Sequence, residues 1–209
     1  MHYFWRNICF MLHLADLDVN KMYTYADYFS WKFEERVELI RGKIFKMSPA
    51  PNRFHQELAG DIHTSLNSFL KGQPCRAYIA PFDVRLPRRS KEDKDIVTVL
   101  QPDICVVCDP SKLDKRGCLG APDIVVEVLS PGNNAKEMKN KYEVYEEAGV
   151  KEYWVVSPQD QTFLIHMLEN GKFHLSPVMV TGDVVTSSIL PGFSMDLTEL
   201  FKRLDPDKM

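Results

Sequence analysis

Acidic residues inside apolar segments are the most informative feature of this chain. Glu127 lies in the run Asp123-Ile124-Val125-Val126-Glu127-Val128-Leu129, and Asp103 begins a similar run, Pro102-Asp103-Ile104-Cys105-Val106-Val107. A carboxylate in such a segment must be paired, protonated or bound to a cation. Two neighbouring strands that each carry one acid therefore predict a divalent-metal site. Mg²⁺ suits it, with Mn²⁺ as an alternative, because Mg²⁺ is bound by one or two carboxylates and keeps waters and phosphate oxygens as its other ligands.

A lysine further along the chain could complete this site. Met138, Tyr142 and Tyr145 form an apolar stripe at helical spacing, and Lys141 shares their face. One interpretation is a stem that packs on the core while the amine stays in water. The other is pairing with the acids of the preceding strand, where Lys141 could orient or activate water, or stabilise developing charge.

Three more residues are candidates for the same site. Glu38 is flanked by apolar residues as Glu127 is, but a surface salt bridge with a nearby arginine is an equally good interpretation. His55 begins a long helix and could contact substrate, or be a capping or core histidine. Asp83 could face the other acids from its own strand, or pair with Arg85 on the surface.

These residues need a scaffold of strands and helices to hold them together. Apolar runs covered on both faces, alternating segments and turn residues predict an α/β domain with a mixed sheet flanked by helices and extra hairpins near both ends. The predicted helices are 23–33, 55–70, 134–148 (with Asn133 or Asn134 as N-cap) and 197–204, and the predicted strands are 77–86, 103–107, 124–129 and 152–156, with hairpins at 36–47 and 162–176 and a Pro-rich loop at 48–52.

Several short motifs, taken in order, carry a family resemblance. They are Glu38-Leu39-Ile40-Arg41-Gly42, His55, Asp83-Val84-Arg85-Leu86, Pro102-Asp103, Val126-Glu127-Val128-Leu129-Ser130-Pro131, Lys141 with Tyr145, Ala148-Gly149-Val150, Glu152-Tyr153-Trp154 and Leu190-Pro191-Gly192. Together they resemble the Uma-two family of putative restriction endonucleases, within the PD-(D/E)XK nuclease superfamily. The resemblance covers about 23–201, and it is the order and spacing of the motifs that make it specific.

The resemblance implies a restriction-endonuclease-like core and magnesium-dependent cleavage of DNA phosphodiesters. Asp103 would be the aspartate of the PD motif and Glu127 the second acid. The superfamily normally places a lysine two residues after that acid, where this chain has Leu129. The family pattern places a lysine in the next helix instead, and Lys141 matches that place. A lysine so displaced must reach back across the sheet.

Length and composition fit one globular domain. The chain has 209 residues, a net charge of −3 and 44% hydrophobic residues, which is enough for one sizeable core. We expect a single endonuclease-like domain at 23–204 after an N-terminal extension at 1–22. The apolar stretch 8–15 is too short to span a bilayer, and a dimer arm is one interpretation of it. We therefore expect a cytoplasmic protein with no membrane segment.

Two residue groups have a plain structural interpretation. The five cysteines, an odd number with two in or beside a predicted strand, indicate reduced intracellular thiols. The CxxC spacing of Cys105 and Cys108 lacks a second pair, and in a strand the two side chains would face opposite ways, which argues against zinc or redox roles. The basic cluster 85–91 is interrupted by acids just after it and reads as a solvated loop.

The sequence leaves three functional hypotheses. The leading one is a metal-dependent endonuclease that acts on DNA as a homodimer, since twofold symmetry suits the cutting of both strands. The second is a nuclease fold retained without catalysis to bind nucleic acid or protein, which the negative charge and Leu129 favour. In the third, the acids and the lysine form a buried structural network only.

Overall fold

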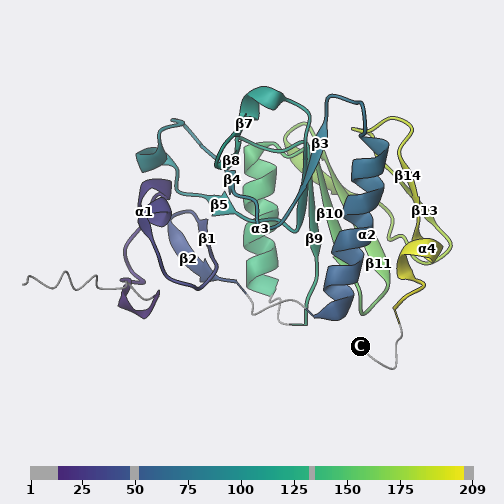
Figure 1. The fold of residues 1–209 in the computed structure, drawn as a ribbon, viewed down its shortest axis with the longest axis horizontal. Coiled ribbons are helices and arrows are strands. Elements are labelled where there is room, and N and C mark those ends of the chain that lie inside the picture. The colour runs from purple at the N-terminus through teal and green to yellow at the C-terminus, as the bar shows by residue number, and fades with distance from the viewer. Residues whose placement is uncertain (1–13, 48–51, 132–134, 205–209) are drawn as a thin grey trace, which may run out of the picture.

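Two six-stranded sheets form the framework of the protein (Figure 1). The computed structural model describes residues 14–47, 52–131 and 135–204. The larger sheet has the strand order β12-β11-β10-β9-β6-β3. Its strands are β3 (Arg76–Ile79), β6 (Ile104–Val107), β9 (Ile124–Val128), β10 (Glu152–Ser157), β11 (Thr162–Glu169) and β12 (Lys172–Leu175).

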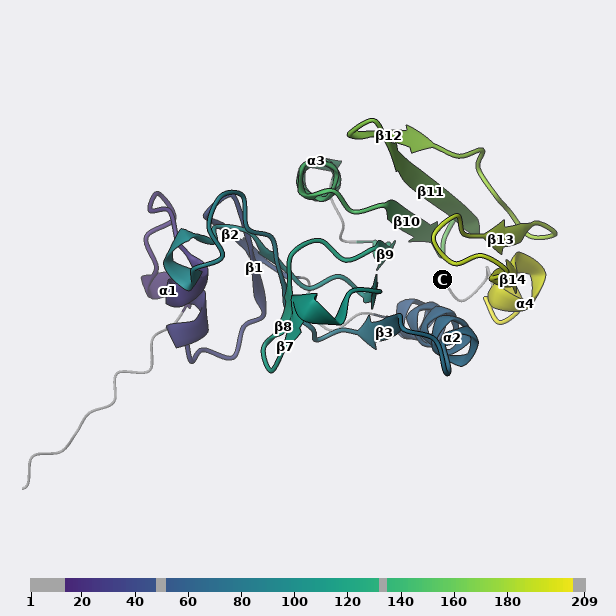
Figure 2. The same ribbon diagram turned by 90° about the horizontal axis from the view of Figure 1, so that it is seen from above.

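This sheet is mixed, as its connections require. β9 and β10 pair in parallel, and the helix α3 (Ala135–Ala148) makes the crossover between them. β6 lies antiparallel to both β3 and β9, and β11 is antiparallel to β10 and β12. The long helix α2 (Arg53–Phe69) packs on one face and α3 on the other (Figure 2). The central strands are therefore buried on both sides, as their apolar runs predict.

The two long helices match their predicted bounds within two residues, whereas the first and last helices are shorter than the predicted 23–33 and 197–204. Asn52 caps α2 by accepting a hydrogen bond from the His55 amide, and Thr24 forms a capping box with Asp27 at the start of α1 (Tyr25–Ser30). The last helix, α4 (Leu197–Phe201), begins at the N-cap Asp196. The predicted N-cap of α3, the loop 48–51 and residues 1–13 lie outside the described residues. No helix in the described part of the chain is long and apolar enough to cross a membrane.

A second sheet stands beside the first and has the order β2-β1-β5-β4-β8-β7. Its strands are β1 (Val37–Ile40), β2 (Lys43–Lys46), β4 (Val84–Arg85), β5 (Val99–Leu100), β7 (Leu113–Asp114) and β8 (Gly117–Leu119). The hairpin of β1 and β2 turns at Arg41 and Gly42, as predicted, and both residues have positive φ. The strands β5, β7 and β8 were not predicted, because they are too short to show an alternating pattern.

The predicted single strand at 77–86 is wrong. The structure divides it into β3, which pairs with β6, and β4, which pairs with β5 and β8 in the other sheet. Pro81 lies between them and has no N–H to donate to a ladder. The chain passes from one sheet to the other at this point, so the two halves of the segment have different neighbours.

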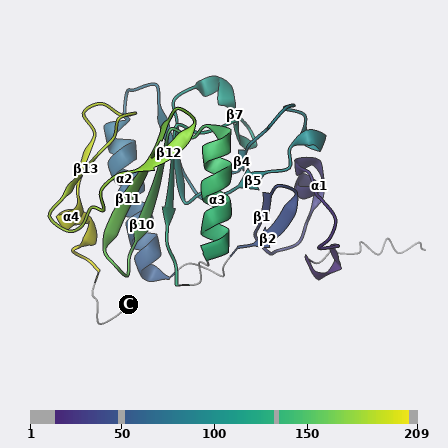
Figure 3. The same cartoon turned by 180° about the vertical axis from the view of Figure 1, so that it is seen from behind.

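The C-terminal part wraps onto the α2 face of the larger sheet (Figure 3). β13 (Val184–Thr186) and β14 (Ser194–Asp196) form a hairpin beside α4. Glu152, buried on β10, holds the intervening loop by accepting hydrogen bonds from Ser187 and Ser188, and it also accepts one from the Trp154 indole. These bonds satisfy a buried carboxylate that has no basic partner among its described hydrogen bonds.

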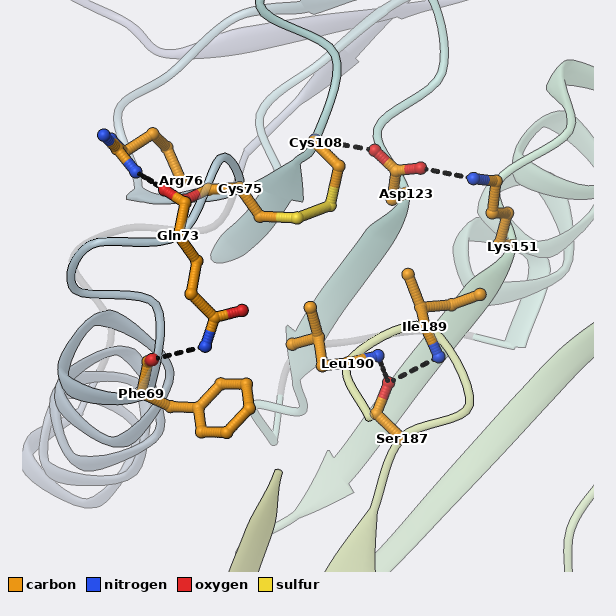
Figure 4. The surroundings of a disulfide bond; sticks show 10 residues. All are labelled: Phe69, Gln73, Cys75, Arg76, Cys108, Asp123, Lys151, Ser187, Ile189 and Leu190. Carbon is orange, nitrogen blue, oxygen red and sulfur yellow. Dashed lines mark hydrogen bonds and ion pairs between the residues drawn. A yellow bond between two sulfur atoms is a disulfide. The ribbon is translucent and has the colours of Figure 1, made fainter. Parts of the chain in front are cut away.

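The cysteines correct another expectation. Cys75, just before β3, forms a disulfide with Cys108, just after β6, with an S–S distance of 2.04 Å (Figure 4). The prediction of reduced thiols is therefore wrong for this pair. Cys108 also donates its backbone N–H to the buried Asp123, which pairs with Lys151. Cys105 and Cys118 are free and buried, and Cys9 lies outside the described residues.

Arg85 does not lie in a solvated loop, as was predicted for the basic cluster 85–91. Its side chain is fully buried, donates to Asp114 at 2.7 Å and lies over the ring of Tyr25. Leu86 is buried too, whereas Arg88, Arg89 and Lys91 are exposed, and Arg88 pairs with Glu147 on α3. The predicted surface position is wrong for Arg85 because β4 is a central strand of the second sheet.

Gly117 provides a stability test of this second sheet. Its φ is +118°, and a Cβ there would overlap the carbonyl oxygen of Asp83, which accepts a hydrogen bond from the Cys118 amide. We expect Gly117→Ala to cost about 2–5 kcal/mol, from backbone strain and overpacking together. Denaturant unfolding measures the loss.

Gly120→Ala is the matched control. Gly120 has the same φ of +118°, but a Cβ there meets only side-chain carbons of Lys112 at 3.8 Å or more. It should show the backbone strain without the overlap. Equal losses of stability in the two variants would contradict the close approach of β8 to Asp83.

Candidate active site

Asp103 and Glu127 meet where β6 and β9 run side by side. Ile104 pairs with Val126 in antiparallel register, so the preceding Asp103 lies beside Glu127. Asp103 Oδ2 accepts a hydrogen bond from the Val128 amide at 2.8 Å. The sequence expectation that the two acids lie on adjacent strands is thus met by the structure.

Lys141 reaches Glu127 from α3. Its Nζ lies 3.0 Å from Glu127 Oε1 and 3.3 Å from Glu38 Oε1. Tyr145, one turn further along the helix, donates its hydroxyl to the same Glu127 oxygen at 2.9 Å. Because α3 connects β9 to β10, it packs back over β9, and Lys141 of the helix can therefore pair with Glu127 of that strand. The sequence indicated Tyr145 only as part of the apolar stripe.

Glu38 joins the cluster from the second sheet. It is 2% exposed, which rules out a surface salt bridge, and its Oε1 also accepts a hydrogen bond from the Gln101 backbone N–H at 2.8 Å. Gln101 precedes Pro102-Asp103 and follows β5, whose pairing with β1 brings it to Glu38. The sequence did not point to Gln101, because a main-chain donor leaves no residue signature.

His55 and Asp83 occupy different places. His55, buried in the first turn of α2, has its Nε2 at 3.1 Å from Asp103 Oδ2, while its Nδ1 finds no hydrogen-bond partner among the described residues. Asp83 accepts hydrogen bonds from Gln101 at 2.9 Å and Tyr28 at 3.2 Å. Asp83 is not among the residues that line the pocket, so it touches the acids only through Gln101.

Burial governs the electrostatics of the cluster. It raises the pKa of Glu127 to about 8; the charge of Lys141 opposes this rise, and the charges of Asp103 and Glu38 add to it. Burial lowers the pKa of Lys141, but Glu127 and Glu38 more than reverse the effect, so that pKa lies above its ordinary value. The lysine is therefore a fixed positive charge, and Glu127 is a carboxylate whose ionisation one lysine does not fully stabilise.

The cluster opens into a pocket of about 120 Å³. The six residues Glu38, His55, Gln101, Asp103, Glu127 and Lys141 described above all line it. The lining also includes Arg36, Ser130 and Glu137. A water molecule occupies about 30 Å³. The pocket therefore has room for an ion with several waters, but a nucleotide must approach from its open side.

The residues of this pocket suit a magnesium ion that keeps several water ligands, and they do not suit an ion that is bound wholly by protein side chains. Among residues 14–47, 52–131 and 135–204, no three His, Cys, Asp or Glu side chains are grouped as ligands of one ion. Mg²⁺ needs only one or two carboxylates, with waters in its other positions. Asp103 and Glu127 could provide that pair, and a bound cation would offset the incompletely stabilised charge of Glu127.

The fold and the site define an α/β protein of the restriction-endonuclease-like class. The structure resembles the crystal structure of a putative nuclease belonging to DUF820 from Anabaena variabilis, with a TM-score of 0.68 and 20% identity, over 88% of this chain and 99% of that one. The family model Uma2, described as "Putative restriction endonuclease", matches residues 25–198. The chain belongs to this family, as its motifs predicted. It is also 23% identical to the uncharacterized protein slr1290 of Synechocystis sp., over 82% of this chain and 88% of that protein.

Proposed function

We propose that this protein is a metal-dependent endonuclease that hydrolyses phosphodiester bonds in DNA. Its family and its nuclease-like fold support the nuclease class. The observation that carries the metal-dependent mechanism is the meeting of Asp103, Glu127 and Lys141 at one pocket, with 3.0 Å between Lys141 Nζ and Glu127 Oε1. Cytoplasmic location and a homodimer remain predictions from the sequence.

Each residue has a proposed task. Asp103 and Glu127 would hold Mg²⁺ or Mn²⁺, which when bound lowers the pKa of a coordinated water and stabilises charge on the phosphoryl group. Asp103 is fixed for this by the Val128 amide and by His55. Lys141 would orient the attacking water or stabilise the phosphate charge, because its positive charge persists at neutral pH.

Glu38, His55 and Asp83 have supporting tasks. Glu38 shares Lys141 with Glu127 and so sets where the ammonium group lies. His55 orients Asp103 and faces the pocket, where it could contact substrate. Asp83 acts at one remove, by holding the Gln101 amide at the pocket wall.

Metal binding tests the proposal directly. Titration calorimetry with MnCl₂ or MgCl₂ should detect binding to the wild-type protein, and Asp103→Asn should weaken this binding more than about tenfold. Even mutation of a residue that only hydrogen-bonds to a metal ligand typically lowers metal affinity about 10- to 100-fold. Asp95→Asn, which removes an exposed acid outside the pocket, is the control. Unchanged affinity in Asp103→Asn would contradict the assignment of Asp103 as a ligand.

A structural network is the second candidate function of the cluster. Lys141 is 5% exposed and already has two carboxylate partners, as a purely structural ion pair would. Under this alternative the fold serves to bind nucleic acid or protein, and the acids only join the two sheets to α3. Absence of metal binding and of cleavage by the folded wild-type protein would favour it.

A further inference from the structure

A second pocket, of about 320 Å³, adjoins the candidate active site. Arg36 and Gln101 line both pockets and form the wall between them. Arg36 donates to the Gln101 side chain at 2.6 Å, and Gln101 in turn donates to the Tyr28 hydroxyl at 3.0 Å. The second pocket is thus one side chain away from the acids.

Aromatic rings make up most of the other wall. The lining residues not shared with the first pocket are Tyr28, Phe29, Trp31, Phe33, Glu34, Glu35 and Val37. Trp31 and Phe33 stack with their ring centres 5.4 Å apart and their planes 28° apart. Tyr28 extends this series, with its ring 5.9 Å from that of Trp31. We call this the aromatic pocket.

Core packing explains these rings only in part, because Tyr28 and Trp31 pack against a buried cluster that includes Tyr23 and Tyr25 but are not themselves buried. Phe29 is 62% exposed, and Trp31 and Phe33 are only partly buried. By contrast, Tyr25 on the same helix is fully buried and accounts for the attachment of α1. Rings that are only partly buried and that line a pocket provide a surface on which a flat aromatic ligand can stack.

The charges around the aromatic pocket select the part of a nucleotide that it can take. Glu34 and Glu35 on its rim repel phosphate but can accept hydrogen bonds from the N–H groups of a base. Arg36, at the boundary with the active site, can meet a phosphate instead. A nucleotide joins its base to its phosphate through one sugar. It could therefore place the base in the aromatic pocket and the phosphate at the candidate active site.

We propose that the aromatic pocket binds one unstacked nucleobase of the strand that is cut at Asp103 and Glu127. The substrate is then single-stranded DNA or a nucleotide displaced from a duplex, because a base inside a helical stack cannot reach the rings. This inference rests on the proposed nuclease function and names its substrate class.

Binding to strands with and without bases tests the pocket. The affinities of a short fluorescent oligothymidine and of an abasic strand of the same length are measured by anisotropy with Ca²⁺ present, and gels check that the strands stay intact. The wild type should bind the strand with bases about 5-fold to 100-fold more tightly, the range expected for base stacking on an aromatic side chain.

Variants separate stacking from folding. Trp31→Ala and Phe33→Ala should lower the affinity for oligothymidine toward that for the abasic strand, which they should leave unchanged, whereas Trp31→Phe should keep most of the preference. Leu175→Ala, an exposed apolar residue on β12 away from the pocket, should change neither affinity. A merely structural role of Trp31 would reduce both affinities together, and this result would overturn the proposal.

Two failures can be told apart. Equal binding of the two strands by a wild type that cleaves DNA would overturn the aromatic pocket and leave the nuclease function standing. A wild type that neither binds DNA nor cleaves it would overturn both. Tighter binding of an intact duplex than of the single strand would also overturn the proposed substrate class.

Discussion

Glu127→Gln is expected to abolish metal-dependent DNA cleavage, with a fall in rate of about 10²- to 10³-fold or more. The carboxylate is one of two proposed metal ligands, and its loss removes several kcal/mol of stabilisation from the developing phosphoryl charge, at 1.36 kcal/mol for each factor of ten. The measurement is the nicking of supercoiled plasmid with Mg²⁺ or Mn²⁺, with a chelator as the blank.

The variant should fold, so the test is a clean one. Burial already raises the pKa of Glu127 to about 8, which means that the folded protein tolerates an uncharged group at this position near neutral pH. Glutamine has nearly the same shape and can still accept the hydrogen bond from Tyr145. Lys141 keeps Glu38 as its partner.

Glu152→Gln is the matched control. Glu152 is also buried, lies on the neighbouring strand β10, and accepts hydrogen bonds from the C-terminal loop instead of lining the pocket. Its replacement should lower stability and leave cleavage per folded molecule unchanged. If folded Glu127→Gln protein cleaves DNA at the wild-type rate, the assignment of Glu127 as a metal ligand is wrong.

Lys141→Met should separate metal binding from catalysis. The change removes the only described cation within 3.3 Å of Glu38 and Glu127, so the pocket becomes more negative. Affinity for Mn²⁺ should therefore be retained or increased, while cleavage falls by about 10²-fold or more, because the charge that orients water or stabilises the phosphate is missing. Calorimetry and plasmid nicking measure the two effects on one sample.

The same variant also tests the structural alternative. Removal of one partner from a buried ion pair costs up to about 3–5 kcal/mol, less here because Glu127 can take up a proton. Lys139→Met, on the exposed side of α3, is the control. If folded Lys141→Met protein cleaves DNA at the wild-type rate while its stability drops, Lys141 serves the fold and not the reaction.

The sequence by itself determined the parts of the site that local pattern can report. Apolar runs identified buried strands, and an acid inside each run stood out because burial of an unpaired charge is costly. Helical spacing placed Lys141 on the face turned toward the core. These inferences needed only residues within a few positions of one another, which is why Asp103, Glu127 and Lys141 were found together.

Only the tertiary structure decided which distant segments meet. Glu38 accepts from Gln101 across 63 positions of sequence, and Cys75 pairs with Cys108 across 33. Such contacts depend on strand order, and two-residue strands such as β4 and β5 carry too little pattern to reveal it. For the same reason Arg85 appeared to be a surface residue, and 77–86 appeared to be one strand.

Lys141 illustrates what the sequence determines and what only the tertiary structure decides. The sequence showed that Leu129 occupies the position where the superfamily has its lysine, and that Lys141 was the candidate to replace it. It could not show whether a side chain on the next helix reaches the acid. The parallel crossover from β9 through α3 to β10 brings Lys141 Nζ to 3.0 Å from Glu127, because the helix packs back over the strand it follows.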